Sequence, residues 1–258
     1  MKAPLLTKAL LKAVCISGLT FAVAPSARSQ DFQVQPVFDM TLLSGWTANG
    51  AALQSIEQLG NQVQGQSRPS RSSTQARSSN SAKSISFAYS PTPALKQKVV
   101  QGYVDRLNKT NPAASQAVSE AFQTGKYNYG QIYWNLIKDS GLRENDAADA
   151  LSAYMILGYM VVNNVQDGNR VTVPMARGVR SQLAPLLSAN SRLTAPGVPA
   201  QLGEEMKLQT VIIHASWQSA AKENTLSNYQ QGIAAMFKDQ YGLDLSQMKL
   251  TDRGFAKK

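Results

Sequence analysis

The sequence predicts an all-α fold: an irregular bundle of about seven helices around a central apolar helix, preceded by a signal peptide and a disordered linker. Three observations lead to this prediction. Apolar residues recur at helical spacing in one segment after another from residue 90 onward. Several of these segments begin with a capping residue followed by proline and end at glycine. The run 144–165 has no wholly polar face, so neighbouring helices must cover it.

Residues 1–29 have the composition of a secretory signal peptide, with a basic start, an apolar middle and small residues before the expected cleavage site. An uncleaved membrane anchor is the alternative, but the apolar core is only about a dozen residues long. Cleavage would remove four basic residues and no acid, so the formal net charge would fall from +10 to +6. It would also remove Cys15, the only cysteine. We therefore expect a secreted or periplasmic protein without disulfides, thiolate metal sites or cysteine nucleophiles.

The next two segments differ in composition from the rest of the chain. Residues 30–60 alternate loosely between apolar and polar and predict a weakly ordered segment that lies against the main domain through Phe38, Leu42, Leu43 and Trp46. Residues 61–89 are rich in Ser, Gln and Arg and contain no acid, which predicts a disordered linker. A plain tether and a cationic strand that lies along an anionic polymer both fit this composition.

The helical domain is expected over residues 90–258, and its first three helices are amphipathic. Thr92 followed by Pro93 starts the first helix, and Asn111 followed by Pro112 starts the second. The second ends near Gly125, and the third covers 128–140. Each has one apolar stripe, so we expect all three to pack around the central helix of residues 144–165.

Four further features follow the central helix. Residues 163–173 fit either a tight hairpin or a loop between helices. Pro174 starts a fifth helix that Pro185 should bend or end. A sixth helix covers about 199–222 and a seventh begins after Thr225 and closes at Gly242. The tail alternates between apolar and polar residues, so its apolar side chains should dock on the bundle and leave Lys257 and Lys258 free. In the domain as a whole, strands should be minor or absent.

Three stretches of the domain are similar to a family of secreted bacterial proteins defined only as a domain of unknown function. They are SGLRENDAADALSAYMILGY, the basic stretch ARGVRSQL and the closing YGLDLSQMKLTDRGF. The resemblance covers residues 90–255 and implies a helical domain behind a signal peptide. It implies no reaction, cofactor or site residue.

The sequence contains no pattern typical of a cofactor or metal site. His214, the only histidine, lies among apolar residues of the sixth helix, which favours a half-exposed or satisfied histidine over a base or ligand. Asp167-Gly168-Asn169 lacks the ligand spacing of a calcium loop, and the glycines form no phosphate loop. We predict no cofactor and no metal.

Carboxylates provide the one remaining route to catalysis. Glu204 and Glu205 lie near the start of the sixth helix, and Asp146 and Asp149 lie in the first turn of the central helix. Cleavage of a glycan needs two facing carboxylates in a cleft, one of them desolvated. Solvated acids at helix N-termini explain both pairs without chemistry.

Basic and aromatic residues suggest two binding surfaces. Arg177 and Arg180 make the fifth helix the most basic part of the domain and could bind an anion, although arginines three apart are also routine on an exposed helix face paired with acids. Tyr127, Tyr129, Tyr133 and Trp134 could stack on a ligand or belong to the core.

Together these features favour a non-enzymatic binding or structural component of the bacterial cell envelope, with no catalytic residue assigned. Two alternatives stay open: a carboxylate-dependent enzyme that acts on cell-wall glycan through Glu204 or Glu205, and an anion-binding module that uses Arg177 and Arg180. The expected partners are an anionic envelope polymer or another envelope protein. We expect no specific nucleic acid and no transmembrane span once the signal is removed.

Overall fold

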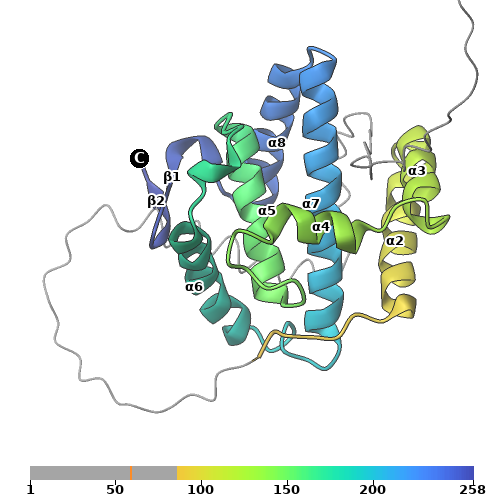
Figure 1. The fold of residues 1–258 in the computed structure, drawn as a ribbon, viewed down its shortest axis with the longest axis horizontal. Helices are drawn as coiled ribbons and strands as arrows, with labels where there is room; N and C mark the ends of the chain where they lie inside the picture. Colours follow the sequence, from red (N-terminus) through yellow and green to blue (C-terminus); the bar gives the residue numbers. More distant parts are fainter. Residues whose placement is uncertain (1–58, 60–85) are drawn as a thin grey trace, which may run out of the picture. The chain divides into compact units, whose positions relative to one another are not determined.

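The described part of the chain is a helical bundle with one small hairpin (Figure 1). The computed structural model describes Leu59 and residues 86–258. The predictions for residues 1–58 and 60–85, which include the signal peptide and most of the linker, lie outside the described residues. The end of the predicted linker is part of the fold, because Phe87 is 2% exposed and Ala88 forms a β-bridge with Asp146. The elements are α2 Pro93–Asn108, α3 Pro112–Val118, α4 Tyr129–Ile137, α5 Ala147–Val162, α6 Val173–Ala189, α7 Val198–Lys222, α8 Leu226–Tyr241, β1 Met248–Thr251 and β2 Gly254–Lys257. The all-α prediction is confirmed.

The helix boundaries follow from local capping. The Thr92 hydroxyl accepts a hydrogen bond from the Leu95 amide at 3.1 Å, and Asn111 caps α3 in the same way. Gly242 ends α8 in the left-handed region at φ 61°. The second expected helix is not uniform, because α3 passes into a π-helical turn, Ser119–Gln123, before Gly125.

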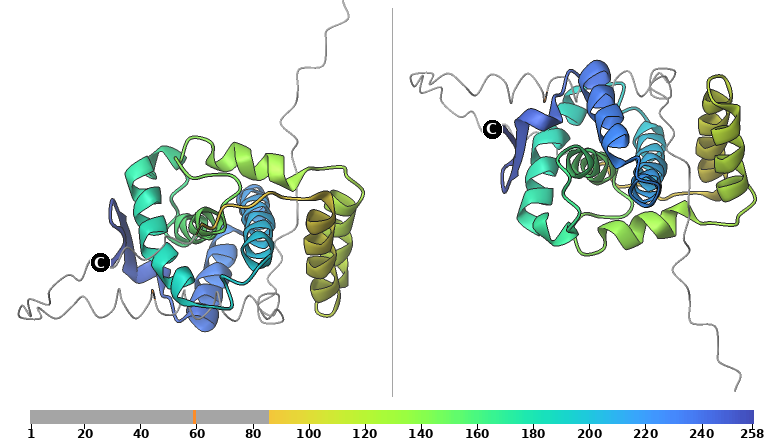
Figure 2. Two further views of the ribbon diagram at one scale, coloured as in Figure 1. Left: turned by 90° about the horizontal axis from the view of Figure 1, so that it is seen from below. Right: turned by 90° about the horizontal axis from the view of Figure 1, so that it is seen from above.

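Helix α5 lies at the centre of the bundle, with α6, α7 and α8 packed around it (Figure 2). Leu151, Tyr154 and Met155 are completely buried, as expected for a helix that is apolar on every side. The prediction that the first three helices pack around α5 is wrong in its detail. Both α2 and α4 pack on α7, and α3 packs on α2, so α7 is a second axis of the bundle. An amphipathic stripe shows that a face is buried but does not identify its partner.

The connection from α5 to α6 is a loop with one 3-10 turn, Gly168–Arg170, so the hairpin alternative for residues 163–173 is wrong. Helix α6 then continues through Pro185 to Ala189. Proline removes one amide donor, so the Ser181 carbonyl loses its helical partner. Ser181 is exposed, and water can therefore satisfy that carbonyl without ending the helix.

The tail docks on α6 as expected, but as a hairpin. Strand β1 pairs antiparallel with β2, with Leu250 opposite Phe255. The Gln182 side chain binds both backbone groups of Phe255, donating to the carbonyl at 2.9 Å and accepting from the amide at 2.8 Å. Lys258 is not free as predicted, because its ammonium donates to the Asn163 side chain at 2.9 Å and to the Ser246 carbonyl at 2.6 Å.

Candidate functional site

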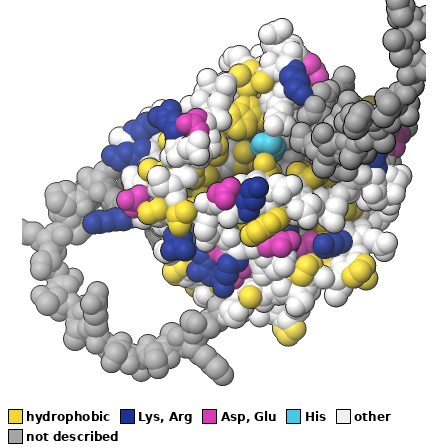
Figure 3. Space-filling model, in the orientation of Figure 1, with side chains coloured by type: hydrophobic (Ala, Val, Ile, Leu, Met, Phe, Trp, Pro, Cys, Tyr) yellow, Lys and Arg dark blue, Asp and Glu magenta, His cyan; other side chains and the backbone are white. Residues whose placement is uncertain are grey.

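The candidate site is an open groove bounded by the end of α4, α5, the loop before α6, the start of α6 and the middle of α7. Its volume is about 600 Å³. Helix α5 contributes Ala153, Ile156, Leu157 and Met160, which share one face at i, i+3, i+4 and i+7. Helix α7 contributes Thr210, His214 and Trp217. Figure 3 shows this face of the molecule, with the single histidine among hydrophobic side chains. We call this feature the His214 groove.

The groove exists because the neighbours of α5 leave one stripe of that helix partly uncovered. Ala153, Ile156 and Leu157 keep 6–7% of their surface exposed, whereas Leu151, Tyr154 and Met155 keep none. At the rim, Leu136 of α4 is 37% exposed, as is Trp134 on the same helix, and only Leu136 lines the groove. The apolar residues of the groove therefore include both a nearly buried floor on α5 and an exposed residue on α4.

His214 is the polar centre of the groove. Its side chain is partly exposed, and no other described residue forms a hydrogen bond with its imidazole. Desolvation by the surrounding protein lowers the pKa of His214 below its usual 6.5. The ring is therefore neutral at pH 7 and offers one donor and one acceptor to whatever enters. The expectation of a half-exposed helix histidine is confirmed.

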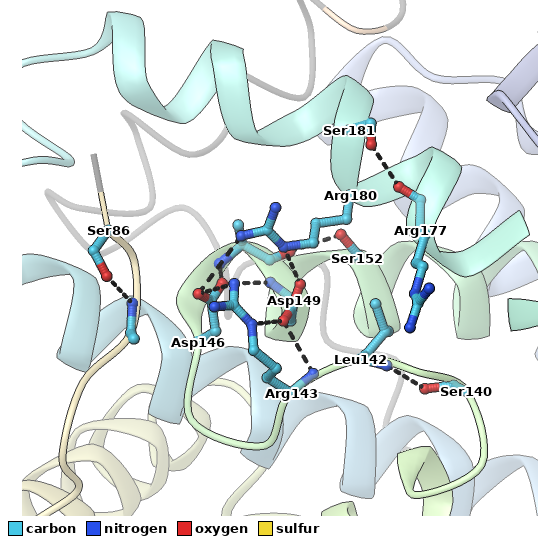
Figure 4. Close-up of polar contacts among 12 residues, drawn as sticks. Ser86, Ser140, Leu142, Arg143, Asp146, Asp149, Ser152, Arg177, Arg180 and Ser181 are labelled. Carbon is cyan, nitrogen blue, oxygen red and sulfur yellow. Dashed lines mark hydrogen bonds and ion pairs between the residues drawn. The ribbon is translucent and has the colours of Figure 1, made fainter. Parts of the chain in front are cut away.

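A second group of functional candidates, Asp146 and Asp149, is buried at the N-terminus of α5 (Figure 4). Asp146 caps the helix by accepting hydrogen bonds from the amides of Ala148 and Asp149 at 3.0 and 3.1 Å. Arg143 donates to Asp149 at 2.8 Å and to Asp146 at 2.5 Å. Both aspartates are 1% exposed, so the prediction that they are solvated is wrong. Asp149 lies in the first turn as predicted, whereas Asp146 is the N-cap that precedes it. Buried carboxylates at a helix N-terminus are stabilised by its dipole and by paired cations.

The structure separates Arg177 from Arg180. The Arg180 guanidinium pairs with Asp149 and lies 3.7 Å from Asp146, whereas Arg177 is exposed and points away from both acids (Figure 4). Arg180 already has carboxylate partners within the protein, as expected from the alternative in which the arginines of this helix pair with acids. Only Arg177 presents its charge to solvent, beside Arg253 and Asp252 at the edge of the hairpin.

Glu204 is fully buried in the middle of a second polar network. Its carboxylate accepts hydrogen bonds from Tyr89 at 2.8 Å, Tyr129 at 2.6 Å and the Lys207 ammonium at 2.7 Å. Lys207, itself 0% exposed, also donates to the Asn145 side chain at 2.6 Å. Burial, reinforced by the charge of Glu204, raises the pKa of both tyrosines well above 10, so both phenols stay protonated and act as donors.

Glu205 points to a different neighbour. It is 3% exposed, and its nearest cation is Arg106 of α2 at 3.7 Å, too far for a hydrogen bond. Desolvation by burial raises its pKa from 4.5 to about 7 against the opposing influence of Arg106. The prediction that Glu204 and Glu205 are solvated helix-terminal acids is wrong, because α7 begins at Val198 and has passed its first turn before reaching them. Neither side chain lines the His214 groove.

The four aromatic candidates divide between core and surface. Tyr129 and Tyr133 are buried, Tyr127 is partly buried, and Trp134 is exposed. They therefore form no common stacking surface.

Comparison with other proteins adds no assignment. No protein-family model, curated protein or solved structure matches the chain. The similarity to a family of secreted bacterial proteins therefore rests on the quoted stretches alone. Within the described residues, no group of His, Cys, Asp and Glu side chains could hold a metal ion, and none of the helices is long and apolar enough to cross a membrane.

The groove itself was not predicted from the sequence. The available signal was the i, i+3, i+4, i+7 pattern on α5 combined with a polar ring within an apolar segment of α7. That pattern is also what a fully covered core face looks like, so only the three-dimensional arrangement distinguishes the two.

Proposed function

We propose that the protein is exported and acts as a non-enzymatic binding component of the bacterial cell envelope, with the His214 groove as its binding site. The observation that carries the proposal is an open groove with apolar and polar lining residues and a neutral histidine in its wall that has no hydrogen-bond partner among the described residues. Small-molecule sites are typically concave, mostly apolar, and about 300–1,000 Å³ in volume, with few polar groups. The composition of residues 1–29 supports export.

The charge around the groove favours a neutral ligand. No lysine or arginine lines it, and Asp139 is the one charged residue among its lining side chains. A carboxylate or phosphate headgroup would meet no cation there and would lie near the Asp139 charge. We therefore take the ligand to be an apolar molecule with one uncharged hydrogen-bonding group, which His214 meets as donor or acceptor.

The geometry gives the glycan-cleaving alternative no support. A catalytic pair must face its substrate across a cleft. Glu204 is enclosed by three hydrogen-bond donors, and Glu205 lies against α2, so the two carboxylates neither face each other nor reach solvent.

Titration of the purified chain with Nile red, a neutral dye that fluoresces in apolar surroundings, tests the proposal. We expect saturable binding at one site. Leu136→Asp places a charge at the groove rim and should weaken binding by about tenfold or more, because an apolar ligand would have to desolvate that carboxylate. His214→Leu keeps the groove apolar and should leave dye uptake intact while weakening ligands that hydrogen-bond to the ring.

Trp134→Asp is the matched control, since Trp134 lies on the same helix with the same exposure and does not line the groove. It should bind the dye like the wild type. Equal losses in Leu136→Asp and Trp134→Asp would mean that the dye reports only general surface hydrophobicity. That result, or the absence of saturable binding, would overturn the proposal that the groove binds a small apolar ligand.

A further inference from the structure

A second cavity lies on another part of the domain, between α2, the π-helical turn and the start of α4. Its volume is about 690 Å³. Its lining includes two lysines, three side-chain amides and a tyrosine: Lys96, Lys98, Gln101, Gln123, Asn128 and Tyr127. None of them lines the His214 groove, so this pocket, which we call the Lys96 pocket, is a separate feature.

The Lys96 pocket is positively charged. Lys96 and Lys98 line it, and no carboxylate does. Neither lysine forms a salt bridge among the described residues, although the Lys98 charge also acts on the Glu205 carboxylate. A methyl group added at Gly130 would lie 3.3 Å from the Lys96 ammonium, so this charge lies over the first turn of α4, where the helix dipole is also positive. The two effects add in favour of an anion.

Neutral polar groups surround this charge. The Gln123 amide donates to the Gln101 side chain at 2.6 Å, and Gln101 in turn donates to Asp105 at 2.7 Å. Asn128 caps α4 through its side-chain oxygen. Each amide is already engaged within the protein, and Gln123 also accepts from the Ser119 hydroxyl, so what each offers to a hydroxyl group is its remaining N–H and lone pair.

Aromatic rings and an unusual backbone complete the pocket. Tyr127 presents a partly buried ring, with the Lys126 ammonium 5.4 Å from its centre. The π-helical turn Ser119–Gln123 carries Phe122 and Gln123 into the lining. Such turns cost stability relative to regular α-helix and occur frequently at functional sites.

We propose that the Lys96 pocket binds an acidic saccharide, a sugar ring that carries a carboxylate or a phosphate. Lys96 pairs with the acid and Lys98, two positions further along α2, adds to the positive field. The amides of Gln101, Gln123 and Asn128 bind hydroxyls, and the Tyr127 ring covers an apolar face of the sugar. A bare anion would use only the lysines, and a neutral sugar only the amides and the ring. The inference is independent of the groove, because it rests on different residues.

Isothermal titration of the purified chain with three probes tests this inference: an oligogalacturonate, a neutral oligosaccharide of the same length, and inorganic phosphate. We expect the oligogalacturonate to bind about tenfold or more tightly than either of the others, because it alone satisfies both the cations and the amides. Its affinity should fall as salt is added.

Variants locate the binding. Lys96→Gln with Lys98→Gln should weaken oligogalacturonate binding by about tenfold or more. The control, Lys238→Gln with Lys249→Gln, removes the same charge from exposed positions on α8 and β1 and should change affinity less than about twofold. Tyr127→Ala should weaken the oligogalacturonate but not phosphate.

Three results would overturn the inference. Equal losses in the two lysine pairs would mean diffuse attraction to a basic protein. Phosphate that binds as well as the oligogalacturonate, with no effect of Tyr127→Ala, would mean an anion site without sugar recognition. A neutral oligosaccharide that binds equally would remove the role of the lysines.

Discussion

Replacing Lys207 with Met should destabilise the fold strongly, because it leaves the Glu204 carboxylate buried without its cation. Lys207 is 0% exposed, and its ammonium lies 2.7 Å from Glu204 and 2.6 Å from Asn145. Removing one partner of a buried ion pair typically costs about 3–5 kcal/mol in free energy of unfolding. For a domain of this size, the melting temperature should fall by roughly 10 °C. Urea unfolding followed by circular dichroism measures the free energy directly.

A second substitution shows whether the loss comes from the uncompensated charge. Adding Glu204→Gln to Lys207→Met removes that charge and leaves a neutral side chain that can still hydrogen-bond Tyr89 and Tyr129. We expect the double variant to recover about 2 kcal/mol or more of the loss. Lys238→Met, at an exposed position, should change stability by less than about 0.5 kcal/mol. A single variant as stable as the wild type, or a double variant no more stable than the single, would refute the reasoning.

Two further predictions concern α5 and α7. Gly158→Ala places a methyl group 2.4 Å from the completely buried ring of Phe237 and should lower the free energy of unfolding by about 1–3 kcal/mol. Gly102→Ala is the control, because its methyl group meets only the Arg106 side chain at 3.5 Å, and it should stabilise α2 by up to about 1 kcal/mol. Thermal melts compare the two variants, and equal effects would contradict the packing argument. For Glu205, the folded-state pKa of about 7 lies above the unfolded value of 4.5, so its contribution to stability is present below pH 4.5 and is lost as pH rises through 7. The free energy of unfolding of the wild type should therefore fall relative to that of Glu205→Gln by about 3 kcal/mol between pH 4 and pH 8, as measured by urea unfolding across that range, and a constant difference would disprove the raised pKa.

The helices were predictable because their boundaries depend on neighbouring residues in the chain. Thr92, Asn111 and Gly242 act within one turn of the backbone they cap, so the sequence contains all the information needed. The central position of α5 was predictable for a related reason, since a helix that is apolar on every side has no stable place at the surface. Of the two outcomes expected at Pro185, a bend or an end, the helix does not end there, because an exposed helix face tolerates one missing hydrogen bond.

The buried charges could not be placed from the sequence. Glu204, Glu205 and Lys207 stand within one turn of each other on α7 and resemble a solvated helix surface. Their partners, Tyr129 and Arg106, come from α4 and α2, at separations of 75 and 99 residues along the chain. Long-range pairing of this kind leaves no periodic signal, because each member looks like an ordinary polar residue in its own segment. The His214 groove was missed for the same reason.

The two buried networks determine the spacing of the groove walls. Buried ion pairs add little net stability compared with well-packed apolar residues, but here the polar contacts join different helices. Arg180 on α6 binds the carboxylates at the start of α5, and Tyr129 on α4 binds Glu204 on α7. These four helices are the ones that bound the His214 groove. Contacts outside the groove therefore hold α5 against α6 and α4 against α7. A ligand that enters the groove does not have to order these helices, so its binding does not bear that entropic cost.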